Sequence, residues 1–142
     1  MTYAAGMRPG DELAGKVALV TGGARNIGRA IAQSLAAGGA TVMVNANTSR
    51  EAGAETVAMI EKAGGKAALH IADVTDPRAV AQLVAETVKK FGRIDLLINN
   101  AAILEEGDAD ILRIPLKLVE RTLINNTVGA LRVAQEIGRA HV

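Results

Sequence analysis

The sequence predicts an α/β protein built on a doubly wound parallel sheet. The sheet is expected to be incomplete, with about four strands in the order 3-2-1-4 and flanking helices. Short apolar runs alternate with segments in which apolar residues recur every three or four positions, and these patterns are typical of buried strands and of helices. The first apolar run also leads into a glycine-bearing turn at residues 21–28. Because parallel crossovers are right-handed, this alternation winds into an open sheet with helices on both faces.

The first strand–helix pair is expected at the start of this pattern. Residues 17–21 are mostly apolar and precede the turn, so they predict the first strand. The helix after it is predicted by Ile27, Ile31 and Leu35, which recur every four residues, and it is expected to end at Gly38 and Gly39.

The second and third strands are expected at residues 41–45 and 66–72. Ser49 is the expected N-cap of the helix between them, which ends at Gly64 and Gly65. The expected inner face of that helix carries three apolar residues: Ala54, Val57 and Ile60.

The last two helices and the fourth strand follow. Asp76 and Pro77 predict the N-cap and the first position of a helix that ends at Gly92. The fourth strand is expected at residues 96–99, and the acidic residues of 105–110 are expected to form a solvated loop. A long last helix is expected, marked by six residues at helical spacing: Leu116, Val119, Leu123, Thr127, Ala130 and Ala134.

The composition fits one globular domain and excludes several classes of function. A net charge of +1 gives no electrostatic case for nucleic acid or for an anionic membrane as a partner. The chain has no cysteine, and His70 and His141 have no partners at metal-ligand spacing, so no metal site is expected. Neither a signal peptide nor a membrane-spanning apolar run is evident, and we expect a cytoplasmic protein.

Residues 16–28, KVALVTGGARNIG, follow the order that the phosphates of a dinucleotide require. A buried strand ends, the backbone turns tightly where glycines leave room, and a helix N-terminus offers free N–H groups to an anion. A plain strand–helix turn with incidental glycines is the alternative reading. The strand before the turn and the helix after it favour a binding site.

This segment resembles the cofactor loop of the short-chain dehydrogenase/reductase family, Thr-Gly-x-x-x-Gly-Ile-Gly, which has a Rossmann-type fold. The resemblance covers about residues 13–136 and implies that five loop residues contact the cofactor: Gly22, Arg25, Asn26, Ile27 and Gly28. Asn26 stands where the family has its second glycine. Asn tolerates a positive φ, so the turn is expected to survive, although the Asn26 Cβ narrows the space for the cofactor.

Two further segments at strand ends match the family. Asp73 and Val74 end the third strand, where the family's Asp contacts the adenine ring. The alternative for Asp73 is that it only accepts backbone N–H bonds in the next turn. Residues 99–102 resemble the family's Asn-Asn-Ala-Gly, which implies that Asn100 and Ala102 lie beside the cofactor, with Ala102 replacing a glycine.

Asn126, with Gly129 three residues later, resembles the family's catalytic Asn. It lies in the middle of a predicted helix, where Asn is a poor helix former. A buried polar residue there is expected either to hold a water in a proton relay or to pin a kinked backbone.

The end of the second strand bears on the choice of cofactor. NAD sites place a carboxylate there to bind the ribose, whereas this chain has Asn45 and Asn47 and no acid. A 2′-phosphate would not be repelled, and Arg25 can pair with it in a bidentate manner. We therefore expect NADP rather than NAD, while a solvated Arg25 is the alternative.

The family's chemistry also needs a Ser and a Tyr-x-x-x-Lys, and the only tyrosine of this chain is Tyr3. The sequence therefore predicts the N-terminal, cofactor-binding part of an NAD(P)-dependent oxidoreductase that acts on a small carbonyl or alcohol, similar to the 3-oxoacyl-carrier-protein reductase branch. A non-catalytic nucleotide-binding or subunit-interaction protein is the alternative. The helix from Leu116 resembles one that pairs subunits in the family, so the parent enzyme is expected to be a homo-oligomer.

Three segments are expected along the chain. Residues 1–12 form a loose N-terminal arm, and residues 13–136 form the N-terminal part of a dinucleotide-binding domain. Residues 137–142, followed by a stop, can be encoded by a common sequencing-adapter sequence, so they are expected to be a non-native tail; a genuine helix end is the alternative.

Overall fold

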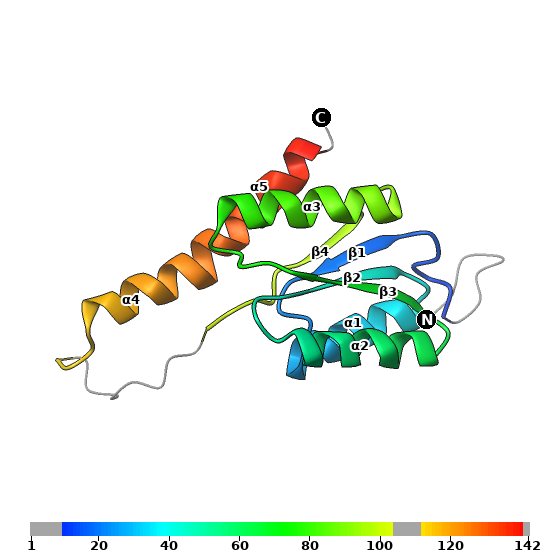
Figure 1. The fold of residues 1–142 in the computed structure, drawn as a ribbon, viewed down its shortest axis with the longest axis horizontal. Coiled ribbons are helices and arrows are strands. Elements are labelled where there is room, and N and C mark those ends of the chain that lie inside the picture. Colours follow the sequence, from blue (N-terminus) through cyan, green and yellow to red (C-terminus); the bar gives the residue numbers. More distant parts are fainter. Residues whose placement is uncertain (1–9, 104–111, 141–142) are drawn as a thin grey trace.

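The computed structural model describes residues 10–103 and 112–140. Four parallel strands form one sheet in the order β3-β2-β1-β4, as predicted. The strands are β1 (Val17–Val20), β2 (Thr41–Ala46), β3 (Lys66–Ile71) and β4 (Leu96–Ile98). The helices are α1 (Asn26–Ala37), α2 (Arg50–Lys62), α3 (Pro77–Phe91), α4 (Leu116–Leu123) and α5 (Ala130–Ala140), with a π-helical segment η1 (Ile124–Gly129) between the last two. Helices α1 and α2 cover one face of the sheet, and α3 and α5 cover the other (Figure 1).

The centre of the sheet is apolar on both faces. Leu19 of β1 is paired with Met43 of β2 on one side and with Leu97 of β4 on the other. All four residues of β1 are buried, which explains why this strand reads as a continuous apolar run rather than an alternating one.

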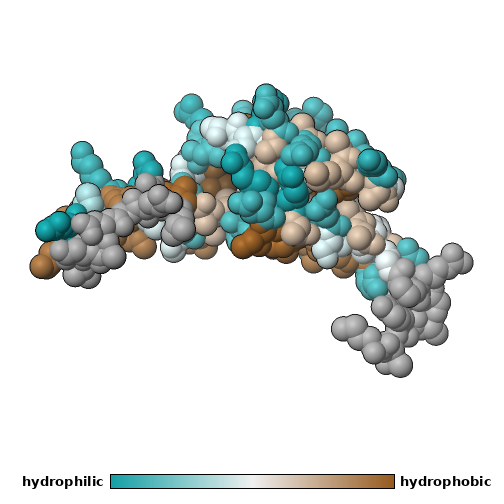
Figure 2. All heavy atoms as spheres, turned by 90° about the horizontal axis from the view of Figure 1, so that it is seen from below, coloured by the Kyte–Doolittle hydropathy of each residue, from teal (hydrophilic) through white to brown (hydrophobic). Residues whose placement is uncertain are grey.

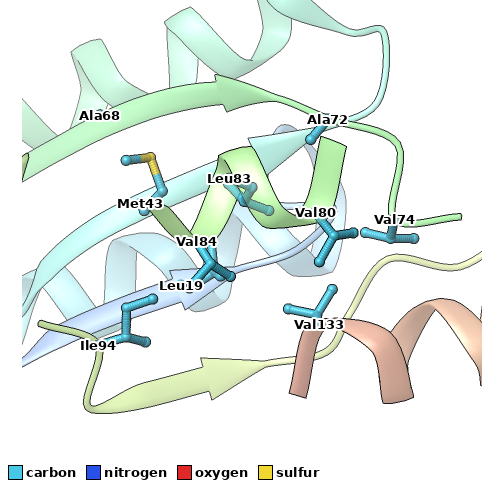
Figure 3. Packing of buried hydrophobic residues seen from close by; sticks show 10 residues of the cluster. All are labelled: Leu19, Met43, Ala68, Ala72, Val74, Val80, Leu83, Val84, Ile94 and Val133. Atoms are coloured by element: carbon cyan, nitrogen blue, oxygen red, sulfur yellow. The ribbon is translucent and has the colours of Figure 1, made fainter. Parts of the chain in front are cut away.

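Two apolar clusters hold the layers together, one on each face of the sheet. The cluster under α3 and α5 is drawn in Figure 3, where Val74, Val80 and Val133 gather at one end. The cluster under α1 and α2 contains eight buried residues: Ala18, Val20, Ala32, Ala36, Ala40, Val42, Val44 and Ile60. Successive strand residues thus point to opposite faces, and both faces are covered by helices.

The helix ends follow the sequence signals in part. Asp76 caps α3, and its Oδ1 accepts a hydrogen bond from the Arg78 backbone N–H at 2.9 Å. Gly92 ends α3 with φ of 85°, a left-handed conformation that glycine adopts without strain. Ser49 precedes α2 as predicted, but its side chain makes no capping bond.

The predicted long last helix is present as α4, η1 and α5, and most of the residues that predicted it are exposed. Leu116 and Leu123 are 79% and 55% exposed, whereas Gly129 and Val133 are buried against the body. Between α4 and α5 the helix passes through the π-helical segment η1, which a regular helical period does not predict. In Figure 1, α4 extends beyond the edge of the sheet.

The structure describes only part of the segments that were predicted at the two ends of the chain and in the acidic loop. Residues 105–110 lie outside the described residues, as do 1–9 and 141–142. Helix α5 continues through Ala140, and Ile137 packs against the core cluster under α3. That residues 137–142 are non-native stays a prediction.

Candidate functional site

The glycine-bearing turn after β1 requires two unusual backbone conformations. Gly22 has φ of 63°, and a Cβ on it would lie 2.9 Å from Ala101 Cα. Asn26 has φ of 48° and is the only non-glycine residue with positive φ among residues 10–103 and 112–140. The expectation that Asn would preserve this turn is therefore confirmed.

Gly28 allows α1 to approach the turn closely. A Cβ at this position would collide with the Gly22 carbonyl oxygen and lie 2.6 Å from Asn100 Nδ2. The first turn of α1, with its free N–H groups, is therefore held directly over the end of β1.

The end of β4 is locked to the same turn by hydrogen bonds. Asn100 Nδ2 donates to the carbonyls of Thr21 and Gly22, each at 3.1 Å. Thr21 Oγ1 accepts from the backbone N–H groups of Asn100 at 3.1 Å and Ala101 at 3.0 Å. The sequence indicated Asn100 as a cofactor contact but did not show that it also fixes the glycine turn.

These elements enclose a pocket of about 570 Å³ at the carboxyl edge of the sheet. It is lined by all eleven residues predicted to bind the cofactor: Gly22, Arg25, Asn26, Ile27, Gly28, Asn45, Asn47, Asp73, Val74, Asn100 and Ala102. Sequence reasoning missed seven further lining residues: Ala24, Ala46, Ser49, Ala72, Ala101, Ile103 and Asn125. Most of these adjoin the carboxyl ends of strands, where ligands bind in open α/β sheets. The predicted strand ends could therefore have identified them as pocket residues.

Asn45 lines the pocket but does not end its strand. It lies within β2, is 1% exposed, and donates from Nδ2 to the carbonyls of Ala72 at 3.0 Å and His70 at 3.3 Å. Because its amide is used inside the protein, Asn45 is poorly placed to stand where NAD sites have a ribose-binding acid. Asn47 follows the strand, also lines the pocket, and fits that position better.

Arg25 and Ser49 lie together at one side of the pocket. A guanidinium nitrogen of Arg25 contacts Ser49 Oγ, and the Ser49 hydroxyl makes no capping bond to α2. The two residues precede α1 and α2, so a cation and two helix N-termini meet at this side of the pocket.

Asp73 builds the turn that follows β3. Its Oδ1 accepts hydrogen bonds from the backbone N–H and the hydroxyl of Thr75, both at 2.8 Å. Asp73 thus accepts a local backbone hydrogen bond, as the alternative interpretation expected, and it also lines the pocket. Val74 is 6% exposed, and a Cβ on Gly129 would lie 2.9 Å from its Cγ2.

Asn126 pins the segment after β4 to the last helix. It accepts from the Ile103 backbone N–H at 2.8 Å and donates to the Ile103 carbonyl at 3.0 Å. It lies in η1, which agrees with the expected disturbed helix, but it is exposed rather than buried. Asn125, rather than Asn126, lines the pocket.

The described residues contain no group of three or more His, Asp or Glu side chains able to hold a metal ion. His70 lies on β3 and His141 lies outside the described part. No helix in the described part is both long enough and apolar enough to cross a membrane.

Comparison with known proteins agrees with this geometry. The family described as short chain dehydrogenase matches residues 16–141. Versicolorin reductase 1 of Aspergillus parasiticus is 43% identical over 133 residues, which are 94% of this chain and 50% of that protein. The short-chain dehydrogenase/reductase homolog YusS of Bacillus subtilis is 46% identical over 97 residues, which are 68% of this chain and 89% of that protein.

A solved structure with a bound nucleotide is also similar. A short chain dehydrogenase from Burkholderia cenocepacia in complex with NADP superposes with a TM-score of 0.83 and 41% identity, over 90% of this chain and 51% of that one. The chain thus spans about half the length of most relatives it matches. On the matched residues, the strand order and the glycine turn, the chain belongs to the short-chain dehydrogenase/reductase family.

Proposed function

We propose that this chain is the nucleotide-binding part of an NADP(H)-dependent short-chain reductase acting on a small carbonyl or alcohol. The observation that carries the proposal is the convergence of the glycine turn and the ends of β2, β3 and β4 on one pocket. When bound, the nicotinamide supplies a hydride donor or acceptor. The residues of this chain supply the cradle that binds and orients the dinucleotide.

The preference for NADP over NAD rests on the side of the pocket beyond β2. The lining residues there are Asn45, Ala46, Asn47 and Ser49, and none of them carries a negative charge. Arg25 lies against Ser49, so a guanidinium faces the same region. A 2′-phosphate meets a cation and neutral donors there, and no carboxylate from β2 competes for the ribose.

The chain itself is proposed to bind the cofactor without turning it over. Its only tyrosine is Tyr3, which no Lys follows four residues later, whereas the resemblance calls for a Tyr-x-x-x-Lys pair after the helix that carries Asn126. Without that pair, the chain lacks the proton donor that the family resemblance implies for the step in which hydride reaches a substrate carbonyl.

Titration of the chain with NADPH and NADH, followed by nucleotide fluorescence, tests this proposal. We expect NADPH to bind at least tenfold more tightly, and Arg25→Ala to weaken NADPH binding about tenfold while changing NADH binding less than twofold. Arg139→Ala is the matched control, because Arg139 pairs with Glu136 on α5, away from the pocket lining. Equal affinity for both nucleotides, or turnover of a ketone by the chain, would contradict the proposal.

A second role is favoured by the outer face of the last helix. Six large apolar residues are more than 40% exposed there: Leu116, Val119, Leu123, Ile124, Val128 and Leu131. Figure 2 shows hydrophobic residues over the projecting part of the molecule at its left. A second copy of the chain would bury this stripe, and light scattering after size exclusion tests it. Leu123→Glu is expected to convert a dimer into monomers, and a wild-type monomer would contradict the role.

A further inference from the structure

Two residues outside the pocket tie the glycine turn to α2. Thr56 is fully buried in α2, and its Oγ1 lies 2.9 Å from the Ala24 carbonyl and 3.0 Å from the Ala52 carbonyl. Arg29 of α1 donates from Nε to Thr56 Oγ1 at 2.9 Å. Neither Thr56 nor Arg29 lines the pocket.

The carbonyl of Ala24 is the point on which these bonds converge. Besides the Thr56 hydroxyl, it accepts from Arg29 Nη2 at 3.0 Å. Because the carbonyl and the N–H of a trans peptide point in opposite directions, fixing the Ala24 carbonyl also fixes the plane of the peptide that leads into Arg25. Hydrogen bonds from a charged donor are the stronger kind, so this peptide is firmly held.

The same two residues also fix the start of α2. Arg29 Nη2 donates to the Ala52 carbonyl at 3.2 Å and pairs with Glu55 Oε2 at 2.6 Å. Ala52 is in the first turn of α2, three residues after Ser49. The backbones on which Arg25 and Ser49 are mounted are therefore joined through Arg29 and Thr56.

We propose that Arg29 and Thr56 are positioning residues that set the separation of Arg25 and Ser49, and thereby the preference of the pocket for a 2′-phosphorylated dinucleotide. The inference rests on the proposed NADP site. Because neither residue lines the pocket, each is expected to act through the backbone that carries Arg25 and Ser49. Their bonds reach the side of the pocket where α1 and α2 begin, so we expect their loss to weaken NADPH binding more than NADH binding.

Thr56→Val tests the inference, because valine keeps the branched shape and removes only the hydroxyl. The matched control is Thr87→Val. Thr87 is also fully buried in a helix and also bonds the carbonyl four residues earlier, Leu83, at 2.6 Å, but it lies in α3 and does not contact the glycine turn. Arg29→Lys keeps the charge but not the forked geometry, and it serves as the second variant if Thr56→Val does not fold.

The readout is the ratio of the Kd values for NADH and NADPH in the full chain. We expect Thr56→Val and Arg29→Lys to lower this ratio about fivefold or more, mostly by weakening NADPH binding, and Thr87→Val to leave it within twofold. A ratio unchanged in Thr56→Val or Arg29→Lys, or lowered equally by Thr87→Val, overturns the inference while the proposed function stands. A wild-type chain without a preference for NADPH overturns both.

Discussion

Two regions of the chain differ in how many of their polar and apolar groups find partners within the chain. The first is the sheet with its glycine turn, residues 13–103, and the second is the last helical stretch, residues 112–140. In the first region the turn is bonded to β4 through Asn100, to β2 through Gly23 and to α2 through Thr56. In the second, one face packs through Val133 onto the body while the opposite face exposes a stripe of large apolar residues. The polar groups of the glycine turn are therefore bonded within the first region, whereas the second region leaves large apolar side chains exposed to solvent.

The largest expected loss of stability comes from adding a methyl group at the tightest point of the first region. Gly28→Ala places a methyl group against the Gly22 carbonyl oxygen, a backbone atom that cannot move aside without opening the turn. We expect a loss of about 3 kcal/mol in the free energy of unfolding and loss of nucleotide binding. Urea denaturation and NADPH titration measure the two effects.

Gly138→Ala is the control for that substitution in the second region. A Cβ at Gly138 meets nothing within 4 Å, and alanine favours a helix over glycine by about 1 kcal/mol. The two glycine-to-alanine changes are thus expected to move stability in opposite directions. Similar effects from both would contradict the contrast between the regions.

Within the last helix, Val133 and Leu131 separate the packed face from the exposed one. Val133 is fully buried and Leu131 is 57% exposed. We expect Val133→Ala to cost about 2 kcal/mol in the free energy of unfolding, and Leu131→Ala to cost less than about 0.5 kcal/mol. If Leu131→Ala costs as much as Val133→Ala, the outer stripe is already covered in solution, and the contrast between the two faces is wrong for the assembled protein.

The joint between the two regions is expected to respond more weakly. Asn126→Ala removes the paired hydrogen bonds to Ile103, which cost about 1 kcal/mol to lose at an exposed position. The Ile103 backbone N–H should then exchange with solvent faster, which amide hydrogen exchange measures. Thr127→Ala, an exposed neighbour in the same π-helical segment, should leave that rate unchanged. An unchanged rate in Asn126→Ala would show that the joint is held by other contacts.

The two regions also differ in how much of them the sequence predicts. The strand order follows from period and crossover handedness, and the pocket lining follows from strand ends meeting at one edge. Local backbone features could also be predicted, namely the positive φ of Asn26 and the N-cap at Asp76. These features depend on neighbours in sequence or on rules that hold for every parallel sheet.

Features that depend on contacts between elements were not readable. Asn45 donates to the carbonyls of His70 in β3 and of Ala72 just after it. The contact of Ser49 with Arg25 arises where the starts of two helices meet. The π-helical segment η1 is a further such feature, because a regular apolar period predicts only a continuous α-helix. An apolar stripe also looks the same in a sequence whether it faces the body or a second copy.

The smallest expected effect on stability is at the edge of the sheet where the parallel strands begin. It tests whether hydrogen bonds within the first region hold β1 and β4 together there. Asp95 Oδ2 accepts from the Val17 backbone N–H at 2.9 Å, and Arg93 and Lys16 lie at 2.6 and 3.7 Å from Oδ1. The Val17 hydrogen bond and then Arg93 and Lys16 hold the pKa of Asp95 below its ordinary value, although burial opposes the shift. A carboxyl whose pKa is lower in the folded state stabilises the fold above its unfolded pKa of about 3.9, and that contribution is lost as the pH falls through the folded value. Urea denaturation should therefore show stability falling below about pH 4, with a shallower fall in Asp95→Asn; equal slopes would show that β1 and β4 are joined at this edge without the carboxylate.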